Sequence, residues 1–132
     1  MATFVRFRSP VPNARGARVG VFALANGLAA DGLLTSDEAA WLRASNDWYN
    51  AAYDEPTPDV FDREMNPITE CWFKSSAVSL IERMDGYLRL LDAHDVRWER
   101  VESDHPGVVV YEDEVQVVVA PATSLLPNGG ER

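Results

Sequence analysis

Cysteine is almost absent from this sequence, since Cys71 is the only one among 132 residues. An internal disulfide is therefore excluded, and a cysteine-based zinc site would need several further thiolates or histidines. The two histidines, His94 and His105, form no HxH or HExxH motif. We therefore predict no metal and no cofactor, and the single cysteine favours a reducing, cytoplasmic location.

Basic residues are scarce as well. The chain has 12 Lys and Arg against 21 Asp and Glu, which gives a formal net charge of −9, and Lys74 is the only lysine. Because affinity for a phosphate backbone comes mostly from clustered Lys and Arg, this balance argues against a nucleic-acid partner. An acidic chain instead favours a protein partner with a basic surface.

The charges are distributed unevenly along the chain. Residues 1–30 contain no Asp or Glu, whereas residues 31–71 contain ten. Internal pairing between the basic start and the acidic middle is the simpler interpretation, and an anion site remains the alternative. The arginines of such a site would be Arg6, Arg8, Arg15 and Arg18.

Long hydrophobic runs are missing too. The clearest candidate, Val19 to Ala30, is interrupted by Gly20, Asn26 and Gly27 and is shorter than the roughly 20 residues of a membrane span. The arginines before it loosely resemble the start of a secretory signal, but the run lies well inside the chain. We therefore predict a buried helix here and no membrane association.

The first residues predict a strand followed by this helix. Residues 3–8 alternate between apolar and basic side chains, as a half-buried strand does. Residues 17–30 are apolar almost all round, which predicts a central helix covered on several sides. Within it Gly20, Ala23 and Gly27 form a bare face, on which we expect another backbone to pack.

A second helix is predicted to begin at Thr35, because Thr35 and Glu38 have the spacing of a capping box. Its apolar residues recur at helical spacing, which we interpret as a stripe facing the core. If Trp48 is fully buried in that core, Trp48→Ala should cost about 3–5 kcal/mol. The stripe consists of Trp41, Leu42, Ser45, Trp48, Tyr49 and Ala52.

The middle of the chain predicts a long connection and a third helix. Residues 54–70 contain prolines and scattered acids, which we interpret as a lid or a partner-binding loop. A helix over residues 76–93 should follow, with a kink at Asp85-Gly86 and its end near His94. The last residues, 124–132, are expected to form a loose tail.

Valine-rich runs on both sides of Glu112-Asp113-Glu114 predict an antiparallel hairpin with an acidic turn. A metal site would need converging oxygens, whereas adjacent residues of an extended chain point to opposite sides. We therefore expect all three carboxylates to point into solvent. Tyr111 and Gln116 flank the turn and would join it in a polar patch that suits a basic protein partner.

A second candidate site combines Asn46, Asp47 and Asn50, on the second helix, with Trp72 and Lys74, which precede the third. An ammonium at a helix start works against the helix dipole, so an acid, for example one from the 54–70 loop, should compensate the charge of this lysine. The simpler alternative is a surface lysine with solvated neighbours.

Catalysis by Cys71 is not favoured, because its neighbours Glu70 and Trp72 are expected to raise the pKa of the thiol. No local signature links this cysteine to His94 or His105 as a base.

Parts of the sequence resemble known proteins. The segment VVVYEDE resembles the strand and turn that open histidine-triad nucleotide hydrolases and pseudouridine synthases, but the clustered histidines of the first and the HRLD-type motif of the second are absent. Most of the chain resembles a set of small actinobacterial proteins of no known activity, which implies one intact domain and no particular chemistry. The matching residues are Pro10–Asn13, Gly32–Leu34, Asn46–Tyr49, Trp72–Lys74 and Pro106–Val119.

Together these patterns predict a single α+β domain over residues 1–132, with three helices packed on a small, mostly antiparallel sheet. The sheet would combine the N-terminal strand with three C-terminal strands, the first of them at residues 96–101. The favoured function is a non-catalytic protein-binding or regulatory module that acts through the 54–70 loop, the acidic turn or both. The alternative is a small enzyme or small-molecule-binding protein with a polar pocket between the second and third helices.

Overall fold

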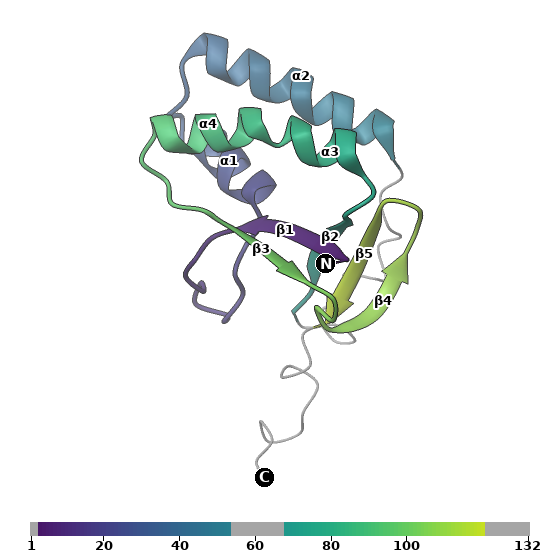
Figure 1. Ribbon diagram of the computed structural model, residues 1–132. Helices are drawn as coiled ribbons and strands as arrows, with labels where there is room; N and C mark the ends of the chain where they lie inside the picture. The colour runs from purple at the N-terminus through teal and green to yellow at the C-terminus, as the bar shows by residue number, and fades with distance from the viewer. Residues whose placement is uncertain (1–2, 54–67, 121–132) are drawn as a thin grey trace. The chain divides into compact units, whose positions relative to one another are not determined.

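The computed structural model describes residues 3–53 and 68–120, and the class is α+β, as predicted (Figure 1). Most of the predicted 54–70 loop and the predicted loose tail lie outside the described residues. The elements in chain order are β1 (Phe4–Arg8), α1 (Val21–Ala30), α2 (Ser36–Ala52), β2 (Glu70–Lys74), α3 (Val78–Arg83), α4 (Asp85–Ala93), β3 (Glu99–Ser103), β4 (Val108–Glu112) and β5 (Gln116–Ala120).

The described residues divide into two compact units, each assembled from segments that are distant in the sequence. The sheet unit comprises residues 3–6, 68–77 and 101–120. The helical unit comprises residues 7–53 and 78–100. The single domain predicted from the sequence stays a prediction.

The strands form a five-stranded sheet in the order β3-β1-β2-β5-β4, and the pairs β1–β2, β2–β5 and β4–β5 are antiparallel. The sequence predicted four strands and missed β2, which is the central one. Its five residues, ECWFK, do not alternate cleanly, because Trp72 and Phe73 are both buried. A central strand can be buried on both faces, so β2 lacks the alternation of apolar and polar residues by which a half-buried strand is recognised in a sequence.

The core of the sheet unit forms around Trp72, whose register partner on β5 is Val117. Val119 completes this buried cluster, and Phe4 and Val101 pack against it. All five residues of β5 are buried. A continuous run of valines is typical of a strand covered on both faces, because β-branched side chains pack well on a pleated surface.

The predicted alternation of β1 is wrong for Arg6, which is buried although it was expected to face solvent. Its Nη1 donates a 2.9 Å hydrogen bond to the carbonyl of Cys71 on the neighbouring strand. Arg8 forms a 2.8 Å ion pair with Glu99, and Arg18 donates to the carbonyl of Pro10. At least three of the four N-terminal arginines thus bond to other parts of the fold.

Helix α1 is shorter and more exposed than predicted. Gly20 is extended and pairs with Arg8 in an isolated β-bridge, so the helix begins only at Val21. Its buried residues lie on a single face, and Ala23 and Gly27 are exposed. A Cβ built on Gly27 would meet no described atom within 4 Å, so the predicted close approach of another backbone is wrong.

Helix α2 begins with the predicted capping box. The Thr35 hydroxyl accepts from the Glu38 amide at 3.1 Å, and the Glu38 carboxylate accepts from the Thr35 amide at 2.9 Å. The same carboxylate also bonds His94, with Nε2 3.0 Å from Oε1. His94 is the C-cap of α4, as predicted, so Glu38 joins the start of α2 to the end of α4.

The predicted third helix is interrupted at Met84, which separates α3 from α4 just before the expected kink. In the helical unit α3 and α4 follow one another alongside α2 and run in the opposite direction (Figure 1). The contacts agree with this arrangement, since Trp41 packs on Tyr87 and the Tyr49 hydroxyl donates to the carbonyl of Leu80.

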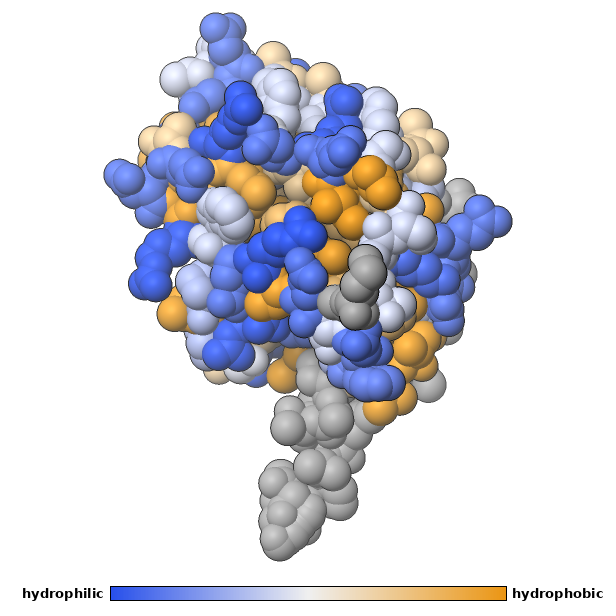
Figure 2. Space-filling model, viewed as in Figure 1, coloured by the Kyte–Doolittle hydropathy of each residue, from blue (hydrophilic) through white to orange (hydrophobic). Residues whose placement is uncertain are grey.

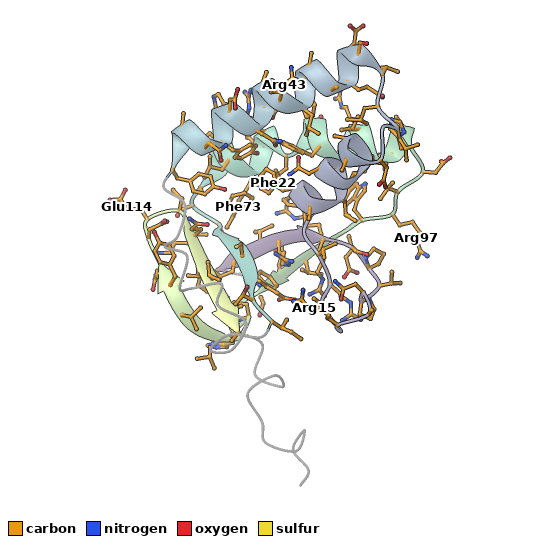
Figure 3. The ribbon with its side chains drawn as sticks, turned by 180° about the vertical axis from the view of Figure 1, so that it is seen from behind. Arg15, Phe22, Arg43, Phe73, Arg97 and Glu114 are labelled. Atoms are coloured by element: carbon orange, nitrogen blue, oxygen red, sulfur yellow. The ribbon has the colours of Figure 1, made fainter. Side chains whose placement is uncertain are left out.

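Aromatic rings fill the centre of the helical unit. Phe22 of α1 meets Tyr49 and Tyr87 edge to face, with ring centroids 4.9 and 5.0 Å apart, and its side chain lies among the helices in Figure 3. Burial raises the pKa of both tyrosines, so their phenols stay protonated and act as hydrogen-bond donors at neutral pH.

Candidate functional site

The apolar stripe predicted on α2 is split between the interior and the surface. Leu42, Ser45 and Tyr49 are buried, whereas Trp41 and Trp48 are 37% and 36% exposed. Helix positions seven apart lie nearly above each other, so the two indoles share one side of the helix. Full burial of Trp48 was therefore a wrong prediction.

Small residues surround these two indoles on α2. We call the exposed apolar surface of the helix its outer face. It lies next to the buried stripe on the helix circumference. On the side of the molecule that Figure 2 shows, hydrophobic surface occurs in small patches between hydrophilic side chains. The outer face consists of Ala40, Trp41, Ala44, Trp48, Ala51 and Ala52.

Trp41 is held by α4. Its ring meets Tyr87 edge to face, with centroids 5.2 Å apart. It also lies against Gly86, where an added Cβ would collide with the indole. The missing side chain of Gly86 therefore provides the space in which Trp41 lies, and more than half of the residue's surface is still covered.

Trp48 is held by α2 and α3. Its ring meets Tyr49 edge to face at 5.1 Å, and the guanidinium carbon of Arg83 lies 4.2 Å from its ring centroid. A cation over an indole face is attracted by the ring quadrupole. Trp48 is therefore an anchored side chain with an open edge.

Acidic side chains border the outer face. Asp37 precedes Trp41 by one helical turn, and Asp47 directly precedes Trp48, and both carboxylates are exposed. Arg43 is another exposed residue of the same helix (Figure 3). The arrangement thus combines two partly exposed indoles that pack on neighbouring helices, small neighbours and an acidic border.

The predicted polar site is divided between the two units. Asn46, Asp47 and Asn50 lie on α2 in the helical unit, whereas Trp72 and Lys74 lie on β2 in the sheet unit. Neither unit by itself brings the five residues together.

Asn46 has a structural role inside the helical unit. Its Oδ1 accepts from the Tyr87 hydroxyl at 2.6 Å, and its Nδ2 donates to Oδ1 of Asn26 at 2.9 Å. These bonds connect a buried phenol through α2 to α1. Because both ends of the amide are engaged, Asn46 is poorly suited to hold a solute.

Within the sheet unit, Trp72 is buried in the core and Lys74 forms a 2.6 Å ion pair with Glu112. The acid that pairs with this lysine therefore lies on β4 and not in the 54–70 loop, where it was expected. Since Lys74 lies in a strand and not at a helix start, the dipole argument for that acid was wrong, although the charge pairing itself is present.

The acidic turn between β4 and β5 is built as a hairpin, but its carboxylates do not all point into solvent. Asp113 folds back and accepts hydrogen bonds from the backbone amides of Val115 and Gln116 at 2.9 and 3.1 Å. It also accepts from the Tyr111 hydroxyl and from Nε2 of Gln116. Aspartate commonly stabilises turns by bonding backbone amides two or three residues ahead.

Of the acidic triplet, Glu114 is the residue that extends from the tip of the hairpin (Figure 3). Glu112 is drawn towards Lys74, and Asp113 is bonded within the turn. Among the residues that the structure describes, no three His, Cys, Asp or Glu side chains gather so that they could hold a metal ion.

The turn should be sensitive to acid. Desolvation favours the protonated form of Asp113, but the hydrogen bonds from Val115, Gln116 and Tyr111 together outweigh it and lower the pKa of the carboxyl from 3.8. A lowered folded-state pKa contributes stability above the unfolded-state pKa, and this contribution is lost as the pH falls through the folded-state value.

We therefore expect Asp113→Asn to lower the free energy of unfolding by about 1–2 kcal/mol at pH 7, because the amide cannot accept as many strong bonds. The difference from the wild type should shrink below about pH 3.8, as the carboxyl takes up a proton first in the unfolded chain and then, at its lowered pKa, in the folded protein. Urea unfolding at several pH values measures both quantities. A constant difference between the two proteins over this range would contradict the role given to the Asp113 carboxylate.

The pKa of the Cys71 thiol is raised and not lowered. Its side chain reaches solvent, but the atoms packed around it desolvate the thiolate and raise the pKa of the thiol. The nearby Arg6 lowers that pKa and Glu70 raises it further, and desolvation has the largest effect. A thiol with a raised pKa is a poor nucleophile at neutral pH, in agreement with the sequence argument.

Comparisons with known proteins add no relative. No protein family model matches the chain, and neither the curated proteins nor the solved structures contain a match. The resemblance to the actinobacterial set therefore stays a prediction. Within residues 3–53 and 68–120, none of the helices has the length and apolarity needed to cross a membrane.

Proposed function

We propose that this protein is an acidic, non-catalytic protein-binding module whose docking surface is the outer face of α2. The observation that carries the proposal is the exposure of Trp41 and Trp48. Both indoles are held in place by packing, Trp41 against Tyr87 and Trp48 against Tyr49. Tryptophan and arginine dominate the binding energy of many interfaces, and a rigid indole loses little conformational entropy on binding.

The negative charge of the chain indicates which charge the partner's surface should have. A net charge of −9, with Asp37 and Asp47 at the border of the outer face, favours a partner with a basic surface around an apolar centre. Glu114, at the hairpin tip, stays a second predicted contact. A cytoplasmic location, inferred from the single cysteine, is part of the same proposal.

The alternative of a polar pocket receives less support. The side-chain amide of Asn46, a residue of that predicted pocket, is hydrogen-bonded to Tyr87 and Asn26. The ammonium of Lys74 is paired with Glu112. A binding module needs none of these groups to be open, whereas a pocket would.

The proposal is tested by capture from native lysate on the immobilised full-length chain, followed by mass spectrometry. A defined protein should be retained by the wild type, and Trp48→Ala should reduce its retention at least tenfold, as expected for a central interface residue. Asp47→Asn should weaken a basic partner several-fold. Leu33→Ala is the matched control, since Leu33 is an exposed apolar residue outside the outer face, at 57% exposure.

Trp48→Ala should still fold, because its partly exposed side chain contributes about 1–2 kcal/mol rather than the value of a fully buried one. Equal retention of the same protein by the wild type, Trp48→Ala and Leu33→Ala would reject the outer face as the docking surface. Retention of a small molecule in native mass spectrometry, without any protein, would reject the module and support the pocket.

A further inference from the structure

The outer face of α2 forms a second apolar stripe beside the one that faces the core. At about 100° per residue, its residues span an arc of about 120°, which is as wide as the stripe by which an amphipathic helix packs on a neighbour. The buried residues Leu42, Ser45 and Tyr49 occupy a separate arc. From Ala40 to Ala52 the outer face is about 18 Å long, at about 1.5 Å per residue. It therefore has room for one further element along α2.

The chemistry of the outer face determines which kind of element fits it. Alanine side chains have no polar atom and an indole has a single N–H donor, so this face cannot satisfy the backbone groups of an extended strand. A helix satisfies its backbone internally and needs only an apolar surface on which to pack. The small side chains of Ala40, Ala44 and Ala51 also allow two helix axes to approach to about 8 Å, the short end of the usual range.

We propose that the partner docks a single amphipathic helix along the outer face of α2, with Lys or Arg on one flank of its apolar stripe. Trp41 and Trp48 are about two helical turns apart, and Ala44 lies between them along the helix. The methyl group of Ala44 leaves space there for a large apolar side chain of the partner. The inference rests on the proposed function, since it names the segment that the same surface binds.

The borders of the outer face decide where the charges of the partner helix belong. By its helix position, Asp47 lies at the edge that is turned away from the buried stripe, and Asp37 lies one turn before Trp41. At the opposite edge the guanidinium of Arg83 lies over the ring of Trp48. Basic side chains of the partner are thus attracted on the Asp47 side and repelled on the Arg83 side, which fixes the direction in which a helix with one basic flank runs.

The test compares two synthetic peptides of about 14 residues that have the same composition of leucine, lysine and glutamine. In the first, the leucines recur at helical spacing with lysine on one flank. In the second, leucine alternates with the polar residues, as in a strand. A fluorophore on each peptide reports binding to the full-length chain by anisotropy. The helical peptide should bind at least tenfold more tightly than the alternating one, and its affinity should fall as salt is added.

Three variants of the protein locate the binding site of the helical peptide. Ala44→Glu places a charge between the two indoles and should weaken binding at least tenfold. Ala23→Glu adds the same charge at an exposed position of α1 and should bind like the wild type. Asp47→Asn should weaken binding several-fold and reduce its dependence on salt.

Equal affinities of the two peptides, or no binding of either at about 1 mM, would overturn the helical partner. Equal binding of the helical peptide to Ala44→Glu and Ala23→Glu would overturn it as well, because the peptide would then lie elsewhere. If Trp48→Ala nevertheless loses a captured protein, the proposed function stands and only the helical form of the partner fails. If no protein is captured and neither peptide binds, both fail.

Discussion

Tyr87→Ala is expected to lower the free energy of unfolding by about 3–5 kcal/mol, the range found when a buried aromatic ring is removed from a core. The side chain is fully buried, and it contacts Phe22, Trp41 and Tyr49 through its ring. Its loss would leave a cavity where three elements of the helical unit meet. Urea unfolding followed by far-UV circular dichroism measures the change.

Tyr87→Phe removes only the hydroxyl and so measures its contribution to stability separately from that of the ring. This variant keeps the packing and should cost about 1–2 kcal/mol, because the side-chain oxygen of Asn46, Oδ1, loses the hydrogen bond that it accepts from Tyr87. Arg89→Ala, on the same helix and 81% exposed, is the matched control and should cost less than about 0.5 kcal/mol. Equal effects of Tyr87→Ala and Tyr87→Phe would show that the ring does not organise the unit.

Alkaline pH provides an independent test of the same residue. Burial raises the pKa of Tyr87 above its ordinary value of 10.0, and the nearby charge of Arg83 opposes this only in part. A raised folded-state pKa contributes stability below the unfolded-state pKa, and this contribution is lost as the pH rises through the folded-state value. The stability difference between the wild type and Tyr87→Phe should therefore change only above about pH 10.

Trp72→Ala is expected to have an effect of similar size, about 3–5 kcal/mol, in the sheet unit. Trp72 is the largest member of the buried cluster with Val117 and Val119, and its strand is the central one of the sheet. Val109→Ala is the control, since Val109 lies on the edge strand β4 at 48% exposure and should cost less than about 1 kcal/mol.

The Tyr87 and Trp72 variants together test the prediction of a single domain. If the two units unfold as one, each substitution should shift the same transition, whether it is followed by tryptophan fluorescence or by circular dichroism. Two separate transitions, one moved by Tyr87→Ala and the other by Trp72→Ala, would show two independent units and contradict that prediction.

Local signals in the sequence were sufficient for several elements. The capping box at Thr35 depends on bonds between residues three positions apart, so its spacing alone predicted it. The valine runs predicted the hairpin, but not the bonds that Asp113 makes within its turn. The end of α4 at His94 was also predicted from the local sequence.

Features set by tertiary contacts could not be predicted in this way. The strand character of β2 depends on neighbours on both sides that are distant in the sequence. The helical period of α2 placed Trp41 and Trp48 next to the buried stripe, but only the position of α3 and α4 beside α2 decides how far each indole is covered.

Glu38 gives the helical unit a single point of weakness. Its carboxylate caps α2 by accepting a hydrogen bond from the Thr35 amide, and it also bonds the imidazole of His94 at the end of α4. The bond from Thr35, and after it the bond with His94, lower the pKa of Glu38 below 4.5. One proton, taken up as the pH falls through that lowered value, weakens both attachments in the same event. Fraying under acid should thus start from this end of the helix pair, and the amides of the first turn of α2 should be the earliest to exchange with solvent deuterium.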